Sequence, residues 1–600
     1  MSIKEVFQNS LLSEAAYADF SDIDISDPGK VKAALIANKF SIVQAEGFVN
    51  HWKVISHQPD TASGFSATLF QNKHNDDYSL AIRGTKGLVD IQEDLNGIVA
   101  LGYARAQIYD LYNFMERLIT PSSETVGQWL VKMGTAADVP LTVAPYEYEA
   151  NIIQGLGSIV NEAGTQTDFD ARLNVMGHSL GGHLALAFSR LFPQWTHSVS
   201  TYNAPGIRES AEAQTLFQSI TGNTGYPDNL EQITTNIIGD ANSEIIAGFN
   251  ELPVPAQFVF IEGQLPSIHN PAGNHSVALL TDSLAVQQLM NAISPSLDTN
   301  DMKTYLEAGA NNAKASLESI VNIISNLFGK ADQVVIEDRD VLYSQIQAIN
   351  IELFVDVKVL EPVLKTQYQN LQIVDVNSLS NSAQLDTTDG FAYRYALENL
   401  NPFAITGHAD LYNQHNADGE LNSEDFSEQY LQDRALLLEA IIQRNLEDSK
   451  HPNKINGEAI RFYDEKLPVG SREIFAGANS SGQGGSNTVE ADRVVYFGDD
   501  NNNIKNISSS KDDRIYGGDG NDTLNGGKSG QYADVLDGGD GDDTYHISKD
   551  DGDTIIRDSD LKGSIKFEGN KLGVGLTSVA GDGRIFEDEE DDDGNRNRYQ

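Results

Sequence analysis

The hydrophobic pattern of the first half of the chain alternates between helical and strand periods. A helical period runs through KEVFQNSLLSEAAYADF, and two strand-like segments follow, FSATLFQN and YSLAIRGT, separated by the polar turn KHNDD. The later segments LNVM, HSVSTYN and ITTNIIGD also have the strand pattern, with helix-like segments between them. Strands that alternate with helices are typical of a mostly parallel sheet. Residues 1–295 are therefore predicted to form an α/β domain.

Two changes of pattern divide the rest of the chain. From 296 to 475 the amphipathic segments DMKTYLEAGANNAKASLESIVNIISNLF and EDFSEQYLQDRALLLEAIIQR predict a mainly helical middle region. From 476 to 560 Gly, Asp, Asn and Ser predominate, and single apolar residues recur at regular intervals, which indicates a repeat domain. Residues 561–600 end in FEDEEDDDGNRNRYQ and are expected to form an acidic tail.

Composition and charge limit the class of protein. A chain of 600 residues is too long for one ordinary core, and its net charge of -46 should repel nucleic acids, so no nucleic-acid partner is expected. The sequence has no cysteine, which excludes disulfides and thiolate metal sites. The N-terminal residues lack the basic and apolar regions of a signal peptide, and no run reaches the roughly 18 apolar residues of a membrane span. We expect no N-terminal signal peptide and no transmembrane segment.

A serine lies at the junction of a strand-like and a helix-like segment, with almost no polar turn between them. Gly177 to Gly181 read GHSLG, which fits the pattern G-x-S-x-G with Ser179 at its centre. A serine at such a strained turn projects its hydroxyl from the edge of the sheet, and side chains two residues before and after it would collide. The pattern therefore predicts that Ser179 is a nucleophile.

Two backbone N–H groups are candidates for stabilising an oxyanion at this serine. The helix that follows begins at Leu180, so the N–H of Leu180 and the positive end of the helix dipole should point toward the reacting oxygen. The second donor is expected in the loop after the strand YSLAIRG, which makes Thr85 the candidate, with its N–H and its hydroxyl. Loss of one such donor typically costs about 3 kcal/mol of transition-state stabilisation.

A nucleophilic serine needs a base and a carboxylate, which follow it in the order Ser, Asp, His on this type of fold. Asp240 ends the strand ITTNIIGD and is the predicted carboxylate. His275 directly precedes an amphipathic helix and is the predicted base, with His269 in the same loop as its rival. Three other acidic residues compete with the predicted carboxylate: Asp228, Glu244 and Glu262.

The C-terminal repeats follow a nine-residue template. The segments GGDGNDTLN and GGDGDDTYH match G-G-x-G-x-D-x-U-x, and GGKSGQYADVLD fits it with an insertion. In this template U is an apolar residue that points inward, here Leu524, Leu536 and Tyr545. The alternative is a disordered, acidic, Gly-rich linker. Carboxylate oxygens are ligands that suit Ca²⁺, and the candidate ligands are Asp519, Asp522, Asp534, Asp540 and Asp543.

Taken together, these motifs resemble one enzyme family. AIRGT with the following Asp90 and Asp94, GHSLGGHLA, YNAPG, Asp240 and NHSVALLTDSLAV are similar to motifs of the class 3 lipases, in a bacterial branch with C-terminal RTX repeats. The resemblance implies an α/β-hydrolase that cleaves the carboxylic esters of lipids. It assigns the nucleophile to Ser179, the base to His275 and the orienting carboxylate to Asp240.

The RTX resemblance implies a fold, a cofactor and a route of export. Such repeats form a parallel β-roll that folds around structural Ca²⁺, and the proteins that carry them leave the cell through a type I secretion apparatus. We therefore expect an extracellular lipase that hydrolyses acylglycerols at a lipid–water interface through an acyl-enzyme. The alternatives are a phospholipase A1 on the same fold, or a calcium-binding surface or adhesion protein with an inactive hydrolase domain.

Overall fold

The chain folds into two units, residues 1–373 and 374–600. The predicted middle region, residues 296–475, is divided between these units. The computed structural model describes the following residues, together with three short strands near the C-terminal end: 1–85, 102–129, 151–160, 172–222, 225–240, 252–262, 275–310, 315–330, 338–357, 363–446, 452–477, 491–509, 511–530, 532–560 and 562–572. Among them, no helix is both long and apolar enough to cross a membrane.

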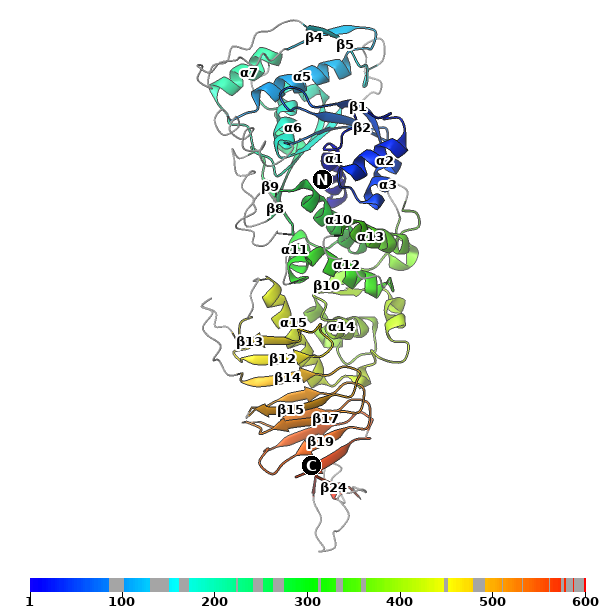
Figure 1. The fold of residues 1–600 in the computed structure, drawn as a ribbon, viewed down its shortest axis with the longest axis vertical. Coiled ribbons are helices and arrows are strands. Elements are labelled where there is room, and N and C mark those ends of the chain that lie inside the picture. Colours follow the sequence, from blue (N-terminus) through cyan, green and yellow to red (C-terminus); the bar gives the residue numbers. More distant parts are fainter. Residues whose placement is uncertain are drawn as a thin grey trace. The chain divides into compact units, whose positions relative to one another are not determined.

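A seven-stranded sheet forms the centre of the first unit, in the order β1-β2-β3-β6-β7-β8-β9 (Figure 1). The first three strands pair antiparallel, and all pairs from β3 to β9 are parallel. The mostly parallel sheet that the sequence predicts is thus confirmed. The strands are β1 (Trp52–Gln58), β2 (Ala67–Asn72), β3 (Tyr78–Ile82), β6 (Leu173–His178), β7 (Thr196–Tyr202), β8 (Thr234–Asp240) and β9 (Ala256–Phe260).

Helices cover both faces of this sheet. Successive residues of a strand point to opposite faces, so Val175 of β6 lies in one hydrophobic core and Met176 in the other. The first core includes residues of α5 (Arg105–Ile119), α6 (Leu180–Leu191) and α7 (Ala211–Thr221). The second includes residues of α1 (Ile3–Ala15), α2 (Pro28–Ala37), α3 (Ile42–His51) and α10 (Val277–Ile293).

Three further helices complete the first unit: α11 (Thr299–Ala308), α12 (Ser316–Leu327) and α13 (Arg339–Leu353). A cluster of charges joins α13 to α1 and α10, because Arg339 lies 2.8 Å from Glu14 and 2.7 Å from Asp282. The hydroxyl of Tyr343 also donates to Asp282, at 2.9 Å. Removal of one partner from a buried ion pair typically costs about 3–5 kcal/mol, so this cluster fixes α13 against α1 and α10.

The second unit combines helices with two sheets of mainly parallel strands. The helices are α14 (Thr388–Glu398) and α15 (Glu428–Leu446). The first sheet has the order β13-β12-β14-β16-β18-β20, with bounds Glu473–Ala476, Ile460–Asp464, Arg493–Phe497, Arg514–Tyr516, Asp534–Asp537 and Thr554–Arg557. The second has the order β15-β17-β19-β21-β22, with bounds Ile504–Ser509, Thr523–Gly527, Thr544–Ile547, Ser564–Phe567 and Asn570–Lys571.

From β14 to β21, consecutive strands alternate between the two sheets, so the backbone winds as a two-sided parallel coil. The three residues that the nine-residue template places inside, Leu524, Leu536 and Tyr545, share one buried cluster with at most 1% of their surface exposed. Their inward orientation is confirmed.

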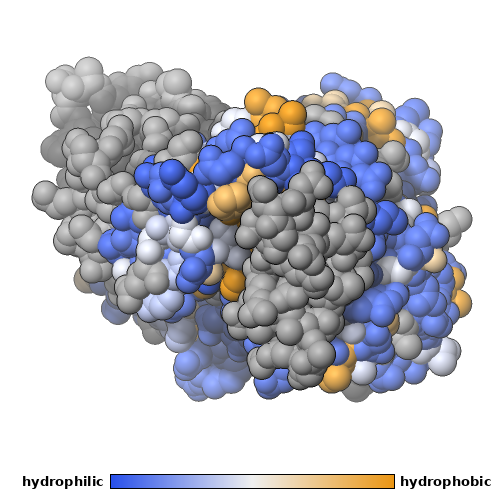
Figure 2. Space-filling view, turned by 90° about the horizontal axis from the view of Figure 1, so that it is seen from below, coloured by the Kyte–Doolittle hydropathy of each residue, from blue (hydrophilic) through white to orange (hydrophobic). Residues whose placement is uncertain are grey.

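On the face drawn in Figure 2, hydrophilic residues predominate among the coloured atoms, and hydrophobic ones form small separate patches.

The remaining elements are short. They are β4 (Thr125–Gln128), β5 (Asn151–Gln154), η1 (Pro193–Trp195), α8 (Leu230–Ile233), η3 (Thr366–Tyr368), β10 (Gln372–Val374), η4 (Val376–Ser382), β11 (Ala404–Thr406), η5 (Ala409–His415), η6 (Ser423–Asp425), β23 (Thr577–Ser578), β24 (Phe586–Glu587) and β25 (Arg598–Tyr599).

Candidate active site

Ser179 occupies a strained turn between the central strand β6 and helix α6. Its backbone has φ 58° and ψ -128°, a region that a non-glycine residue enters at a cost on the order of 1–3 kcal/mol. The N–H of Ser179 donates to the carbonyl of Tyr202 on the neighbouring strand, at 2.8 Å, which holds the turn in register with the sheet. The sharp strand-to-helix turn that the sequence predicts at this serine is confirmed.

The two glycines that flank the serine are required by close backbone contacts. A Cβ on Gly177 would lie 2.3 Å from the carbonyl carbon of Gly181. A Cβ on Gly181 would lie 2.0 Å from the carbonyl oxygen of Ile82, at the end of β3. Both distances are far below van der Waals contact, so neither position accepts a side chain without movement of the backbone.

The end of β3 lies directly beside the nucleophile. A Cβ on Gly84 would lie 3.2 Å from Cβ of Ser179 and 2.5 Å from the carbonyl oxygen of His178. Thr85 follows Gly84 in the chain, and Leu180 is the first residue of α6, whose N–H has no acceptor within the helix. The structure thus brings the segments of both predicted oxyanion donors to Ser179, and their role stays a prediction.

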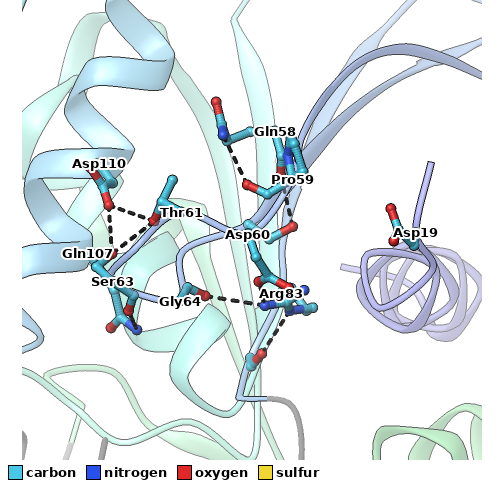
Figure 3. A network of polar contacts seen from close by, with 12 residues as sticks. Asp19, Gln58, Pro59, Asp60, Thr61, Ser63, Gly64, Arg83, Gln107 and Asp110 are labelled. Carbon is cyan, nitrogen blue, oxygen red and sulfur yellow. Dashed lines mark hydrogen bonds and ion pairs between the residues drawn. The ribbon is translucent and has the colours of Figure 1, made fainter. Parts of the chain in front are cut away.

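Arg83 fixes the end of this strand through a network of polar contacts (Figure 3). Its guanidinium forms an ion pair with Asp60 and donates to the carbonyls of Gly64 and Gly84, both at 3.3 Å. The loop that carries Asp60 is held in turn by Asp110 of α5, which accepts hydrogen bonds from Thr61 at 2.7 Å and from Ser63 at 2.6 Å. The backbone beside Ser179 is therefore tied to a helix on one face of the sheet.

His275, the predicted base, is buried against His178, the residue that precedes Ser179. Its side chain is 3% exposed, and its ring packs on the ring of His178 with 4.6 Å between centroids. The Nε2 of His178 lies 2.6 Å from the backbone oxygen of His275. The rival His269 lies outside the described residues.

Asp240, the predicted carboxylate, lies at the expected edge of the sheet. His178 is in register with Tyr202 and Tyr202 with Ile237, so the end of β8 lies at the same edge as the nucleophile. The carboxylate of Asp240 forms an ion pair with Lys303. The structure therefore places His275 against His178, the residue that precedes Ser179, and the catalytic roles of Ser179, His275 and Asp240 stay predictions.

The competing acidic residues have different surroundings. Asp228 is exposed, and Glu244 lies outside the described residues. Glu262 accepts a hydrogen bond from the backbone N–H of Leu317 at 2.7 Å. Burial and the neighbouring Glu318 raise the pKa of Glu262 to about 8, so this group is a neutral acid at pH 7 and a poor partner for an imidazolium.

His183, one helical turn after the serine, is a structural residue. It is fully buried, its Nε2 accepts from the backbone N–H of Ala104 and its Nδ1 donates to the carbonyl of Pro205, both at 3.3 Å. Burial lowers its pKa to about 4, so the ring is neutral at ordinary pH.

Two residues of the site lie outside the sequence pattern for a catalytic triad. The Tyr17 hydroxyl lies 2.9 Å from Nδ1 of His178, although Tyr17 lies two residues beyond the end of α1, far from the serine in sequence. His178 occupies a variable position of G-x-S-x-G, so the motif gives it no role. Arg83, in contrast, is visible in the sequence as the charged residue that ends a strand beside a glycine.

The candidate calcium ligands fall into two groups. The carboxylates of Asp522, Asp534 and Asp543 are at most 1% exposed, whereas Asp519 and Asp540 are exposed. One oxygen of each buried carboxylate accepts a backbone N–H from the preceding turn of the coil. The pairs are Asn503 with Asp522 at 2.6 Å, Asp513 with Asp534 at 2.8 Å and Asp522 with Asp543 at 2.8 Å.

The second oxygen of each buried carboxylate makes the coil suitable for a cation. The Oδ2 atoms of Asp522, Asp534 and Asp543 have no hydrogen-bond partner among the described residues, a costly state for a buried charge. Burial and nearby carboxylates raise the pKa of Asp522 to about 6 and that of Asp534 to about 7. No three acidic or histidine side chains of the described residues form a ligand cluster, so backbone carbonyls would have to supply the other oxygen ligands.

Comparison with known proteins gives similarities to solved lipase structures. Lip2 lipase from Yarrowia lipolytica is 16% identical with TM-score 0.25, over 45% of this chain and 91% of that one. A Rhizomucor miehei lipase propeptide complex is 13% identical with TM-score 0.21, over 43% and 67%. Extracellular lipase LipA from Serratia marcescens is 12% identical with TM-score 0.19, over 98% and 76%. No family model and no curated protein matches the sequence.

Proposed function

We propose that this protein is a secreted lipase that hydrolyses the ester bonds of acylglycerols at a lipid–water interface. The observation that carries the proposal is the strained backbone of Ser179 at the edge of an α/β sheet, with Gly84 on one side and the buried ring of His275 close by. This arrangement matches the nucleophile turn of serine ester hydrolases, in which a hydroxyl, an imidazole and free backbone N–H groups converge.

The residues act in the order that acyl transfer requires. Ser179 Oγ attacks the ester carbonyl while His275 takes its proton, and the N–H groups of Leu180 and Thr85 stabilise the oxyanion. His275 then gives the proton to the leaving alcohol, and an acyl-enzyme remains on Ser179. Water attacks the acyl-enzyme with His275 again as base, and the fatty acid leaves. Asp240 would orient His275 and stabilise its charged form.

We infer that the C-terminal coil is a calcium-binding β-roll of the RTX type. Asp522, Asp534 and Asp543 would hold Ca²⁺ together with backbone carbonyls of the glycine-rich turns, and Asp519 and Asp540 lie at the exposed ends of these turns. Bound Ca²⁺ would supply structural charge neutralisation and no step of the ester chemistry. Export through a type I apparatus and an extracellular location follow from the same assignment.

The test of the proposed function is fatty-acid release from triolein and from phosphatidylcholine vesicles, each with and without Ca²⁺. Wild type should hydrolyse triolein, and Ser179→Ala should lower kcat by about 10³-fold or more. Ser189→Ala is the matched control, because Ser189 is a fully buried serine of the same helix α6 and donates to the carbonyl of Leu186 at 2.8 Å. Release from phosphatidylcholine alone would reassign the protein as a phospholipase. No release from either lipid would support a binding protein with an inactive hydrolase domain.

A further inference from the structure

Tyr17, His178 and His275 form a chain of contacts beside the nucleophile. The Tyr17 hydroxyl lies 2.9 Å from Nδ1 of His178, and Nε2 of the same ring lies 2.6 Å from the backbone oxygen of His275. The Tyr17 hydroxyl also lies against Gly84, where a Cβ would be 2.4 Å from it. Four segments that are far apart in sequence therefore meet here: the segment of Tyr17 after α1, the end of β3, the turn of the nucleophile and the segment of the base.

The direction of each hydrogen bond follows from the chemistry of the groups. A carbonyl oxygen can only accept, so Nε2 of His178 must carry the proton that is donated to His275. In a neutral imidazole the other nitrogen is then an acceptor, and the Tyr17 hydroxyl must donate to Nδ1. One tautomer of His178 satisfies both partners, and the Tyr17 hydroxyl selects it.

We propose that Tyr17 and His178 are positioning residues for the base, in which Tyr17 fixes the tautomer of His178 and His178 holds the backbone of His275 beside Ser179. This inference rests on the proposed function, because it concerns the base of the same reaction. Neither residue touches the reacting atoms. Together they hold the backbone from which the imidazole of His275 projects, and an error of about 1 Å in such a position costs on the order of 10²-fold in rate.

The charge of His178 matters for the same reason. Its ring is 4.6 Å from the ring of His275, which becomes positive when it takes the proton of Ser179. A second positive ring at this distance would oppose that step. Burial is the main cause that lowers the pKa of His178, and the ring therefore stays neutral while His275 is protonated.

Substitutions of Tyr17 and His178 test separately the hydrogen bond between these two residues and the hydrogen bond from His178 to the backbone oxygen of His275. Tyr17→Phe removes the hydroxyl and leaves the ring, so His178 can adopt the other tautomer and lose its bond to His275. His178→Gln places an amide N–H near the position of Nε2, and this donor needs no help from Tyr17. His178→Asn places its amide near Nδ1 instead, so it can bond to Tyr17 and does not reach His275.

The experiment measures kcat and KM for hydrolysis of a soluble short-chain ester by full-length wild type and these variants. We expect Tyr17→Phe and His178→Asn to lower kcat roughly 10- to 100-fold with KM within a few-fold. His178→Gln should retain most of the activity, and adding Tyr17→Phe to it should have little further effect. Equal losses in His178→Gln and His178→Asn, or a full loss from Tyr17→Phe in the His178→Gln background, would overturn the inference.

Two controls separate this inference from loss of fold and from failure of the proposed function. Tyr412→Phe removes a buried tyrosine hydroxyl in the second unit, which donates to the carbonyl of Ile405 at 2.6 Å, and should leave kcat unchanged. If Ser179→Ala abolishes hydrolysis and Tyr17→Phe matches wild type, the positioning role fails and the lipase proposal stands. If Ser179→Ala matches wild type, the proposed function fails and the inference falls with it.

Discussion

The carboxylate of Asp240 forms an ion pair with the ammonium group of Lys303, at the end of strand β8. The two side chains are 36% and 37% exposed, and ion pairs of this kind contribute about 0–1 kcal/mol to stability. Only Oδ2 of Asp240 takes part in the described contact. The pair is therefore easily broken, and it leaves one carboxylate oxygen for another donor.

Substitution of Asp240 tests whether it orients the base. Asp240→Asn should lower kcat by about 10²–10⁴-fold with KM little changed, because the imidazolium of His275 loses its compensating charge. Lys303→Met breaks the same ion pair from the other side and should leave kcat within a few-fold of wild type. Steady-state measurements of kcat and KM with a soluble ester test whether Asp240 orients the base. Wild-type kcat in Asp240→Asn would transfer the role of carboxylate to a different residue.

Substitution of Gly181, one of the two glycines that flank Ser179, should lower both the stability of the first unit and its activity. Gly181→Ala places a methyl group 2.0 Å from the backbone oxygen of Ile82, so it should destabilise the first unit by about 1–3 kcal/mol and distort the nucleophile turn. Gly47→Ala is the control, because it lies inside α3 with nothing within 4 Å of the added methyl group, and it should stabilise by roughly 0.5–1 kcal/mol. Thermal melting and ester hydrolysis are measured for both. An active and stable Gly181→Ala would show that the turn tolerates a side chain.

Calcium removal should destabilise the second unit. A ligand present at 100 times its Kd stabilises the state that binds it by about 2.7 kcal/mol, so chelation should lower the melting temperature of the coil. The double variant Asp522→Asn, Asp543→Asn should lose most of this calcium response, whereas Asp519→Asn, at an exposed position, should lose little of it. Melting followed by circular dichroism, with Ca²⁺ or with chelator, gives the comparison. Equal melting of wild type in both conditions would contradict the calcium assignment.

The stability of the first unit should fall as the pH rises from about 4.5 to about 8. In this window Glu262 is protonated in the folded chain and ionised in the unfolded chain, because burial and Glu318 raise its folded pKa to about 8. The unfolded state then binds fewer protons, and stability falls by up to about 1.4 kcal/mol per pH unit. Glu262→Gln should remove this dependence, and the exposed Glu231→Gln should keep it. Melting temperatures at pH 5, 7 and 9 measure the effect, and identical pH profiles for wild type and Glu262→Gln would refute it.

Local sequence patterns predict those parts of the fold that depend on residues close to one another in the chain. Strands β2, β3, β6, β7 and β8, the strained turn at Ser179 and the inward side chains of the coil follow from periodicity and glycine spacing. The sheet strands β1 and β9 are not among the strand segments that the sequence predicts. The contacts of Tyr17 with His178 and of Asp240 with Lys303 do not, because each joins residues from elements that only the tertiary fold brings together. The packing of α13 on α1 and α10 has the same cause, since it depends on the contacts of Arg339 with both Glu14 and Asp282.

The hydrogen bonds of the buried aspartates give the C-terminal coil a polarity. Asp522 accepts the N–H of Asn503, 19 residues earlier, and Asp543 accepts the N–H of Asp522, 21 residues earlier. Each rung is thus completed by the rung that comes after it. Removal of the rung that contains Asp543 would therefore take the acceptor away from the N–H of Asp522, whereas removal of the rung that contains Asn503 would take a donor away from the carboxylate of Asp522. The two ends of the coil thus present different chemical groups to whatever follows or precedes them: free amide donors at one end and free carboxylate acceptors at the other.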